Sequence, residues 1–444
     1  MFQAVYVPIG VPTFHLESAQ AAFEKSIALL REIEPEVRVP QEMLLSLDLL
    51  TDYLKEKQPD LIILQNLTFA NAAYASEVLH RFDCPILLWT LREPVIDGTR
   101  LRLNSLTGAY SAANAISAFR GDRFTYVFGS PEEESAAQKV RAAISAARVR
   151  YDMRKLKMAS IGHTPQGFGF GRALDLDLLT TFGVTLESIE ARELIDIAKN
   201  YSDEEVEADL ADAKTRITGL DQIKKENVLD FARLCRAYRE YVTKNGIGAV
   251  SSRCWPDFFT AFGTPVCAVM GILNDLGVAT ACEADAYGAL SMYIAMQLSH
   301  GPVFFGDPVS MDEKENTITY WHCGMAACSL AREDTGAVAG LHCNRKIGPT
   351  LEFGCRAAEH ATVFRIGRLP DGSFRFFLKK GKALDKPQQF YGTSVVVEME
   401  SPVAETVEKS VKAGWEPHFA VAFSDISTEI RILAEYMGIP VLEY

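Results

Sequence analysis

The chain has 444 residues, of which 48% are hydrophobic and 23% are charged, and its formal net charge at pH 7 is -13. A single hydrophobic core stops growing at about 250–300 residues, so this length predicts two or three cores. The negative charge disfavours nucleic acid as a partner, because binding to phosphates requires clustered Lys and Arg.

No apolar run in the sequence is long enough to span a bilayer. Met1–Pro12 has no basic segment and leads into the strand-like AVYVPIG, so it does not resemble a signal peptide. We therefore expect a cytoplasmic protein that does not enter membranes and whose partner is a small molecule.

The nine cysteines form no CxxC pair, and an odd number without an export signal predicts reduced thiols. Cys282 and Cys323 lie beside Glu283 and His322, where they could be soft metal ligands. Alternation along a strand would point each thiol away from that neighbour, so we expect small buried core residues instead.

The first third of the chain alternates short apolar strands with amphipathic helices. The predicted strands are Ala4–Val7, Leu61–Leu64, Pro85–Trp89 and Phe124–Phe128, and the predicted helices between them include Ser18–Ile33 and Leu44–Lys57. A basic stretch near residue 150 leads to a second alternation from Met158, which includes a long polar helical region, Asp203–Lys244. Both patterns predict doubly wound parallel sheets.

After Asp307 the segments TITYWHC, ATVFRI, FRFFLKKG and TSVVVEME alternate apolar and polar residues, which predicts antiparallel strands in a small barrel or sandwich. A helix, a strand, a closing helix and a last strand follow from residue 402. We therefore expect an α/β protein with two doubly wound parallel-sheet domains, residues 1–150 and 151–308, and a C-terminal, mostly antiparallel β domain, residues 309–444.

Glu283 and Asp307 are the main candidate site residues, because each ends a short apolar run. Both runs predict buried parallel strands, and open α/β sheets keep their active sites at the carboxyl ends of such strands. Two carboxylates that meet there predict a divalent cation, proton transfer, or both. The alternative for each is helix capping.

Motifs along nearly the whole chain resemble the L-fucose isomerase-like and L-arabinose isomerase-like sugar isomerases. The motifs are GIGAVSSRCWPDFF, LNDLGVATACEADAYGAL, FFGDP, TITYWHCG, PILLWTLREP, RLRLNSLTGAYSAAN, IGHTPQGFGF and GWEPHFAVAF. The resemblance implies an aldose–ketose isomerase that acts through a cis-enediol on L-fucose, D-arabinose, or a 6-substituted hexose such as sulfoquinovose. It also implies Mn2+, with Mg2+ or Co2+ as alternatives, held by Glu283, Asp307 and His418, and it makes the two carboxylates the catalytic acid and base.

Several further residues are candidates for contact with the sugar. Arg253 and Trp255 follow a predicted strand, although Trp255 is equally well explained as a core residue. His322 ends a strand, and both substrate contact and metal ligation remain open for it. Arg345 and Lys346 are adjacent cations, either for an anionic substrate group or in a solvated loop.

The glycines of PQGFGFG, residues 167, 169 and 171, do not have the spacing of a dinucleotide fingerprint and predict a tight turn at the crevice instead. No GxSxG motif supports a hydrolase. A sugar-binding protein without catalysis and a metal-dependent aldolase or epimerase remain as alternative functions.

The resemblance also implies a homo-oligomer, a trimer or a hexamer, in which the first domain of one chain covers the crevice of another. Trp89, Arg92 and Asn104 would then contact the substrate of a neighbouring chain. The alternative for Arg92 and Asn104 is that they only order their loops.

Overall fold

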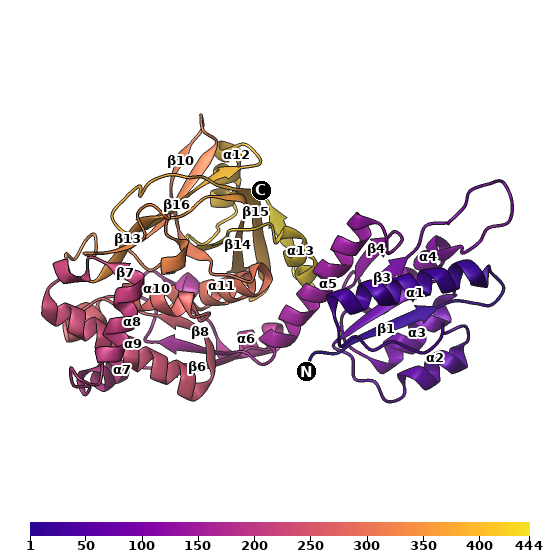
Figure 1. The fold of residues 1–444 in the computed structure, drawn as a ribbon, viewed down its shortest axis with the longest axis horizontal. Coiled ribbons are helices and arrows are strands. Elements are labelled where there is room, and N and C mark those ends of the chain that lie inside the picture. The colour runs from indigo at the N-terminus through magenta and orange to yellow at the C-terminus, as the bar shows by residue number, and fades with distance from the viewer. The chain divides into compact units, whose positions relative to one another are not determined.

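The computed structural model describes all residues from Met1 to Tyr444. The chain forms two compact units (Figure 1). The first unit contains Met1–Asp152 with Thr428–Pro440, and the second contains Met153–Ser427 with Val441–Tyr444. None of the helices has the length and the apolar character that crossing a bilayer requires.

The first unit is built on a parallel sheet of four strands in the order β1-β2-β3-β4. The strands are β1 (Ala4–Ile9), β2 (Leu61–Asn66), β3 (Ile86–Thr90) and β4 (Thr125–Phe128). The helices are α1 (Leu16–Ile33), α2 (Leu47–Leu54), α3 (Ala72–Arg81), α4 (Ser105–Arg120), α5 (Glu134–Met153) and α13 (Ser427–Met437).

Helices cover both faces of this sheet, as the buried apolar strands require. Leu50, Val78 and Ile116 of α2, α3 and α4 join one core cluster with the strands, while Phe23 of α1 stacks on Tyr6 of β1 at 6.1 Å. Residues 38–44 run parallel to the other edge of β1 through the bridges Val5–Arg38 and Ile9–Leu44, so the strand order reverses at β1, as in the predicted doubly wound sheet.

The second unit begins with a parallel sheet in the order β6-β5-β8-β9. Its strands are β5 (Lys157–Ile161), β6 (Thr185–Ile189), β8 (Ile247–Ser252) and β9 (Ala279–Cys282). Its helices are α6 (Asp175–Phe182), α7 (Ala191–Lys199), α8 (Glu207–Arg216), α9 (Lys225–Asn245), α10 (Cys267–Asp275) and α11 (Ala286–Ser299), with short turns η1 (Gly169–Gly171), η2 (Leu220–Gln222), η3 (Phe258–Phe262) and η4 (Cys328–Leu330). The strand order reverses between β5 and β8, as in a doubly wound sheet, and ligands bind at the carboxyl ends of strands beside such a reversal. The predicted helical region from Asp203 is two helices, α8 and α9, separated by the short strand β7 (Ile217–Thr218).

Six antiparallel strands of the second unit close into a barrel, because β15 pairs with both β14 and β16. The barrel strands are β10 (Phe304–Asp312), β11 (Thr317–His322), β14 (Ala358–Arg368), β15 (Phe374–Ala383), β16 (Thr393–Met399) and β17 (Phe419–Ala422). Strands β12 (Ala337–Gly340), β13 (Thr350–Gly354) and β18 (Val441–Glu443) and helix α12 (Val403–Lys412) complete the unit. This agrees with the predicted antiparallel C-terminal region.

Strand β10 corrects the prediction for Asp307. The residue does not end a parallel strand, because β10 continues to Asp312 and pairs antiparallel with β11 and β17. The apolar run stops at Asp307 because the later residues of β10 are exposed. Helix α11, which is almost completely buried, connects β9 to β10 and so links the parallel sheet to the barrel.

Candidate active site

Glu283 lies in the turn between β9 and α11, at the carboxyl end of the second sheet. Glu283 and Ala284 have φ angles of 58° and 54°, which only a few per cent of non-glycine residues adopt. The amide of Ala284 donates to the carbonyl oxygen of Ser252 at 3.1 Å, and the indole N–H of Trp255 donates to Oε1 of Glu283 at 3.0 Å. The neighbouring strand β8 and the loop after it therefore hold this unusual turn, and the Glu283 side chain lines a cavity.

Asp307 reaches the same cavity from the barrel. Strands β10 and β11 approach so closely before it that a Cβ on Gly306 would lie 2.5 Å from the carbonyl oxygen of Trp321. An irregularity in the ladder follows between Pro308 and Ser310. Such bulges bend a strand and change the direction of its side chains. The side chain of Asp307 is 31% exposed.

His418, which immediately precedes β17, joins the two carboxylates. Its Nε2 lies 3.1 Å from Oε2 of Glu283 and 3.4 Å from Oδ1 of Asp307. The three residues that the sequence predicted as metal ligands therefore converge, although they come from a turn of the parallel sheet and from two barrel segments.

Asp285 and Arg365 hold His418 in place, and all three are buried. Oδ2 of Asp285 lies 2.9 Å from Nδ1 of His418, and Arg365 donates to both oxygens of Asp285 at 2.5 and 3.2 Å and to the His418 carbonyl oxygen at 3.1 Å. Burial raises the pKa of Asp285, but the Arg365 charge and the His418 hydrogen bond outweigh it and hold this pKa well below its usual value. An ionised Asp285 accepts a hydrogen bond from Nδ1–H of His418, so Nδ1 carries the ring proton that faces Asp285.

The other ring nitrogen of a neutral His418 is then an acceptor that faces two carboxylates. Nε2 is buried without a hydrogen-bond partner, which is rare for a polar atom. Burial lowers the pKa of His418, but Asp285 and Glu283 outweigh it and raise this pKa to about 9. Burial raises the pKa of Glu283, but the nearby imidazole of His418 and the charge of His322 lower it overall. Nε2 of His418 and the carboxylates of Glu283 and Asp307 are three acceptors that face one another. They need a positive charge between them, which is either a proton on Nε2 or a cation that binds both hard oxygens and imidazole.

His322, at the end of β11, has its ring beside this group. One ligand atom from each of Glu283, His322 and His418 lies within 4.8 Å of the others. The backbone amide of Cys323 donates to Nδ1 of His322 at 2.9 Å, and burial lowers the pKa of His322. The neutral ring therefore carries its proton on Nε2, which suits a donor to a substrate oxygen better than a metal ligand.

Glu283, Asp307 and His322 line a cavity of about 410 Å³, which is a typical size for a small-molecule site. Phe168, from the loop after β5, is part of the cavity wall, and its ring centroid lies 6.1 Å from that of Trp255 and 6.4 Å from that of His418. A Cβ on Gly171 would lie 2.8 Å from Cα of Asp285, so the glycine lets this loop pack on the site. The glycines of PQGFGFG thus form a tight turn at the crevice, as predicted. The lining residues are Phe168, Cys254, Trp255, Cys267, Cys282, Glu283, Asp307, Trp321, His322, Cys323, His342, Asn344, Arg345 and Pro417.

Arg345 brings a positive charge to the cavity wall. Its guanidinium lies over aromatic rings rather than beside a carboxylate, 5.6 Å from the Trp255 centroid and 5.1 Å from the Phe259 centroid. Lys346 does not line this cavity and lies 5.5 Å from the Tyr391 ring. Of the two predicted adjacent cations, only Arg345 is therefore placed to meet an anionic group in the cavity.

Arg253 is absent from the cavity lining as well. Its Nε lies 2.8 Å from Oδ2 of Asp257 and donates to the carbonyl oxygen of Trp255 at 3.1 Å. Arg253 therefore supports the loop that carries Trp255, whereas Trp255 itself reaches Glu283.

The three candidates of the first unit have different surroundings. Trp89 is completely buried in β3 and donates its indole N–H to the carbonyl oxygen of Gly129 at 2.9 Å, so it offers no surface to a ligand. Arg92 is exposed and pairs with Glu133 at 2.8 Å. Asn104 precedes α4 with a φ of 54°.

Asp285, Arg365 and Phe168 belong to the site but were not among the residues predicted from the sequence. Asp285 could have been recognised from its place two residues after Glu283 and just before the apolar helix α11, where an Asp caps a helix. Arg365 gives no such signal, since it lies within an apolar strand far from Asp285 in the sequence.

Comparisons with known proteins agree over the whole chain. No family model matches it. The sulfoquinovose isomerase of Clostridium sp. (strain MSTE9) is 62% identical over 436 residues, which cover 98% of each chain. The sulfoquinovose isomerases of Priestia aryabhattai and Alkalicoccus urumqiensis are 35% and 34% identical, over 99% and 100% of this chain and 98% and 99% of theirs. The chain therefore belongs to the sulfoquinovose isomerase family, and it is an aldose–ketose isomerase.

Proposed function

We propose that this protein converts sulfoquinovose, a hexose with a sulfonate group on C6, into the corresponding ketose. Relatives with this name match nearly the full chain. The observation that carries the proposal is that Arg345 lines the same cavity as Glu283 and Asp307. These two carboxylates and His418 are called the carboxylate–histidine group below. L-Fucose and D-arabinose, which the resemblance also allowed, have no anionic group for Arg345.

We further propose that Glu283, Asp307 and His418 hold Mn2+, with Mg2+ or Co2+ as alternatives. The donor set of two carboxylates and one imidazole suits these ions, and the buried Nε2 of His418 without a hydrogen-bond partner supports the fit. A cation bound there would polarise the sugar carbonyl and make the proton on C2 more acidic.

Glu283 and Asp307 carry the proton between the two carbons. One carboxylate takes the proton from C2, the electron pair of that bond becomes the double bond of a cis-enediol, and the former carbonyl oxygen is protonated. A carboxylate then returns a proton to C1 while the hydroxyl on C2 loses its proton and becomes the ketone. The Trp255 hydrogen bond fixes Glu283 during these steps.

His322 and Arg345 orient the open-chain sugar. The Nε2–H of His322 donates to a sugar oxygen near the carboxylates, and the Arg345 guanidinium binds the sulfonate. The rings of Trp255 and Phe259 beside Arg345 exclude water from that contact, which strengthens it.

The direct test is NMR of sulfoquinovose incubated with the Mn2+-loaded protein in D2O. We expect the ketose to accumulate with deuterium at C1, because the transferred proton exchanges with solvent on a carboxylate. Unchanged sulfoquinovose with a verified Mn2+-loaded protein would reject the substrate. Ketose without deuterium at any conversion would indicate a hydride shift, and a C2 epimer as product would indicate an epimerase.

Membership in an isomerase family already decides against a sugar-binding protein without catalysis.

We also propose that the chain assembles as a trimer or hexamer in which the first unit of one chain covers the cavity of another. Arg92 and Asn104 are the residues of the first unit that would then reach the substrate of the neighbouring chain.

A further inference from the structure

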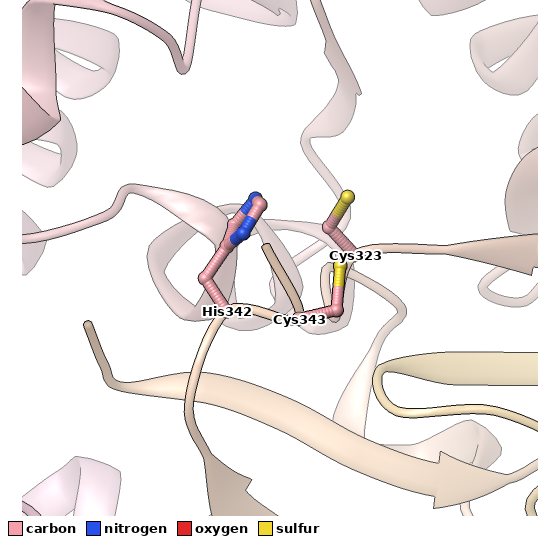
Figure 2. Close-up of side chains that lie close together, drawn as sticks. All are labelled: Cys323, His342 and Cys343. Carbon is pink, nitrogen blue, oxygen red and sulfur yellow. The ribbon is translucent and has the colours of Figure 1, made fainter. Parts of the chain in front are cut away.

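Two cysteines and a histidine, all possible metal ligands, lie close together (Figure 2). Cys323 follows β11, and His342 and Cys343 begin the loop between β12 and β13. One ligand atom from each of the three residues lies within 4.8 Å of the others. None of the three takes part in the isomerisation described above.

The surrounding backbone holds these residues in place. Gly324 packs so closely on β13 that a Cβ there would lie 2.4 Å from the Leu351 carbonyl oxygen, which fixes the chain directly after Cys323. The His342 amide donates to the carbonyl oxygen of Ile347 at 2.9 Å, and the His342 ring lies edge-on to Phe259 at 5.0 Å. The cluster is therefore largely formed before any ligand binds.

We propose that Cys323, His342 and Cys343 form a second cation site, which takes a soft d10 ion such as Zn2+. Two thiolates and one imidazole are ligands that Zn2+ prefers, whereas Mn2+ prefers the oxygen-rich group of Glu283 and Asp307. Sulfur atoms around a tetrahedral Zn2+ lie about 3.8 Å apart, given Zn–S bonds of about 2.3 Å, so the side chains need to move only slightly.

Binding of the ion would displace the thiol protons of Cys323 and Cys343, because the thiolate is the form that ligates a metal. The weak 3.3 Å hydrogen bond from the Asn344 amide to Nδ1 of His342 breaks if Nδ1 takes the metal or the proton.

The position of the site predicts an effect on catalysis. Cys323 and His342 line the 410 Å³ cavity, and Cys343 lines an adjacent, more open groove of about 710 Å³. An ion bound there would occupy the cavity wall, with its fourth coordination position available to water or substrate. The same loop carries Arg345, so Zn2+ should inhibit turnover at concentrations at which extra Mn2+ does not.

The test uses the full-length protein, reduced and saturated with Mn2+ so that the carboxylate site is protected. Cd2+, a spectroscopic substitute for Zn2+, is added while the ultraviolet thiolate-to-cadmium charge-transfer band is recorded. We expect the band to saturate at one Cd2+ per chain. Cys343→Ser should weaken this binding by at least about a hundredfold, since loss of even an outer partner of a ligand costs tenfold to a hundredfold.

A matched control separates this site from the other nearby thiols. Sγ of Cys254 lies 3.6 Å from Sγ of Cys267 beneath the same cavity, so Cys267→Ser should keep the band. Absence of a band in the wild type, persistence of the band in both Cys343→Ser and Cys323→Ser, or its loss only in Cys267→Ser would each overturn the proposal. The readout needs no turnover, so it stands apart from the test of the isomerase reaction.

Discussion

Glu283, Asp307 and His418 form a set because each presents an electron-rich atom to the same point. Asp285 fixes the orientation of the His418 ring, because it accepts a hydrogen bond from Nδ1–H and leaves Nε2 facing the carboxylates. Arg365 in turn keeps Asp285 ionised. A site of this kind is stable only when a positive charge fills it.

Glu283→Gln and Asp307→Asn should each lower kcat by at least about a hundredfold, the contribution of a positioned general base. Initial rates with sulfoquinovose measure the loss, and circular dichroism checks the fold. Glu190→Gln, at an exposed carboxylate outside the cavity lining, is the control and should retain activity. Near-normal turnover of a folded double variant would exclude the pair as proton carriers.

Metal binding should depend on pH through His418, whose pKa is raised to about 9 in the metal-free site. At neutral pH the ring is protonated, so a cation must displace about one proton. The apparent Mn2+ affinity should therefore rise roughly tenfold per pH unit towards pH 9 and fall as the pH drops. Calorimetry in buffers of different ionisation enthalpy counts the proton. Binding without proton release between pH 6 and 8 would contradict this assignment.

Arg345→Gln should raise KM for sulfoquinovose about tenfold to a hundredfold, the range for a hydrogen bond to a charged group. The effect on kcat should be smaller, because the sulfonate has the same charge in substrate and transition state. Lys346→Gln is the matched control and should leave KM nearly unchanged. Equal effects of the two substitutions would place the sulfonate elsewhere.

At the scale of elements, the turn after β9, the loop after β5 and helix α11 together make the site. The loop after β5 brings Phe168 over the imidazole of His418, and Gly171 makes that approach sterically possible. Helix α11 connects the turn that holds Glu283 with the barrel strand that holds Asp307.

Gly171→Ala should destabilise the fold by about 1–3 kcal/mol, as overpacking does, and should lower kcat because the new Cβ displaces Asp285. Gly169→Ala is a close control in the same loop, since a Cβ there has no atom within 4 Å. Thermal unfolding and initial rates of both variants give the comparison. Equal behaviour of the two variants would show that the contact with Asp285 is unimportant.

At the scale of the whole molecule, the described cavity lies entirely within the second unit. The second unit contains the complete carboxylate–histidine group and the cavity, whereas the first contains Arg92 and Asn104. Trp89 is a packing residue of β3 and is a poor choice for probing contacts between chains. Arg92 is the better probe because its side chain is exposed.

If the site is shared between chains, two inactive variants should restore activity in mixed oligomers. Glu283→Gln lacks the proton carrier, and the double variant Arg92→Ala with Asn104→Ala lacks the contacts from the first unit. Mixing after reversible dissociation should recover part of the wild-type rate. No recovery in oligomers shown to contain both variants would place each site within one chain.

The alternation of elements, the antiparallel C-terminal region and the two carboxylates that meet in the cavity could be predicted from the sequence, because local periodicity and motifs indicate them. It did not reveal that β10 runs past Asp307, since the later residues of that strand are exposed and lack an apolar pattern. It also could not separate Arg345 from Lys346, because two adjacent residues of one loop point to different surroundings.

Which distant residues meet depends on long-range packing, which the sequence pattern does not reveal. The contacts of Arg365 with Asp285, and of Asp285 with His418, join positions 80 and 133 residues apart, and the packing of α11 against β14 and β17 creates them. The same holds for Cys323 with His342 and Cys343, whose proximity depends on how β11 lies relative to the loop before β13. Local sequence fixes what each residue can do chemically, whereas long-range packing fixes which residues act together.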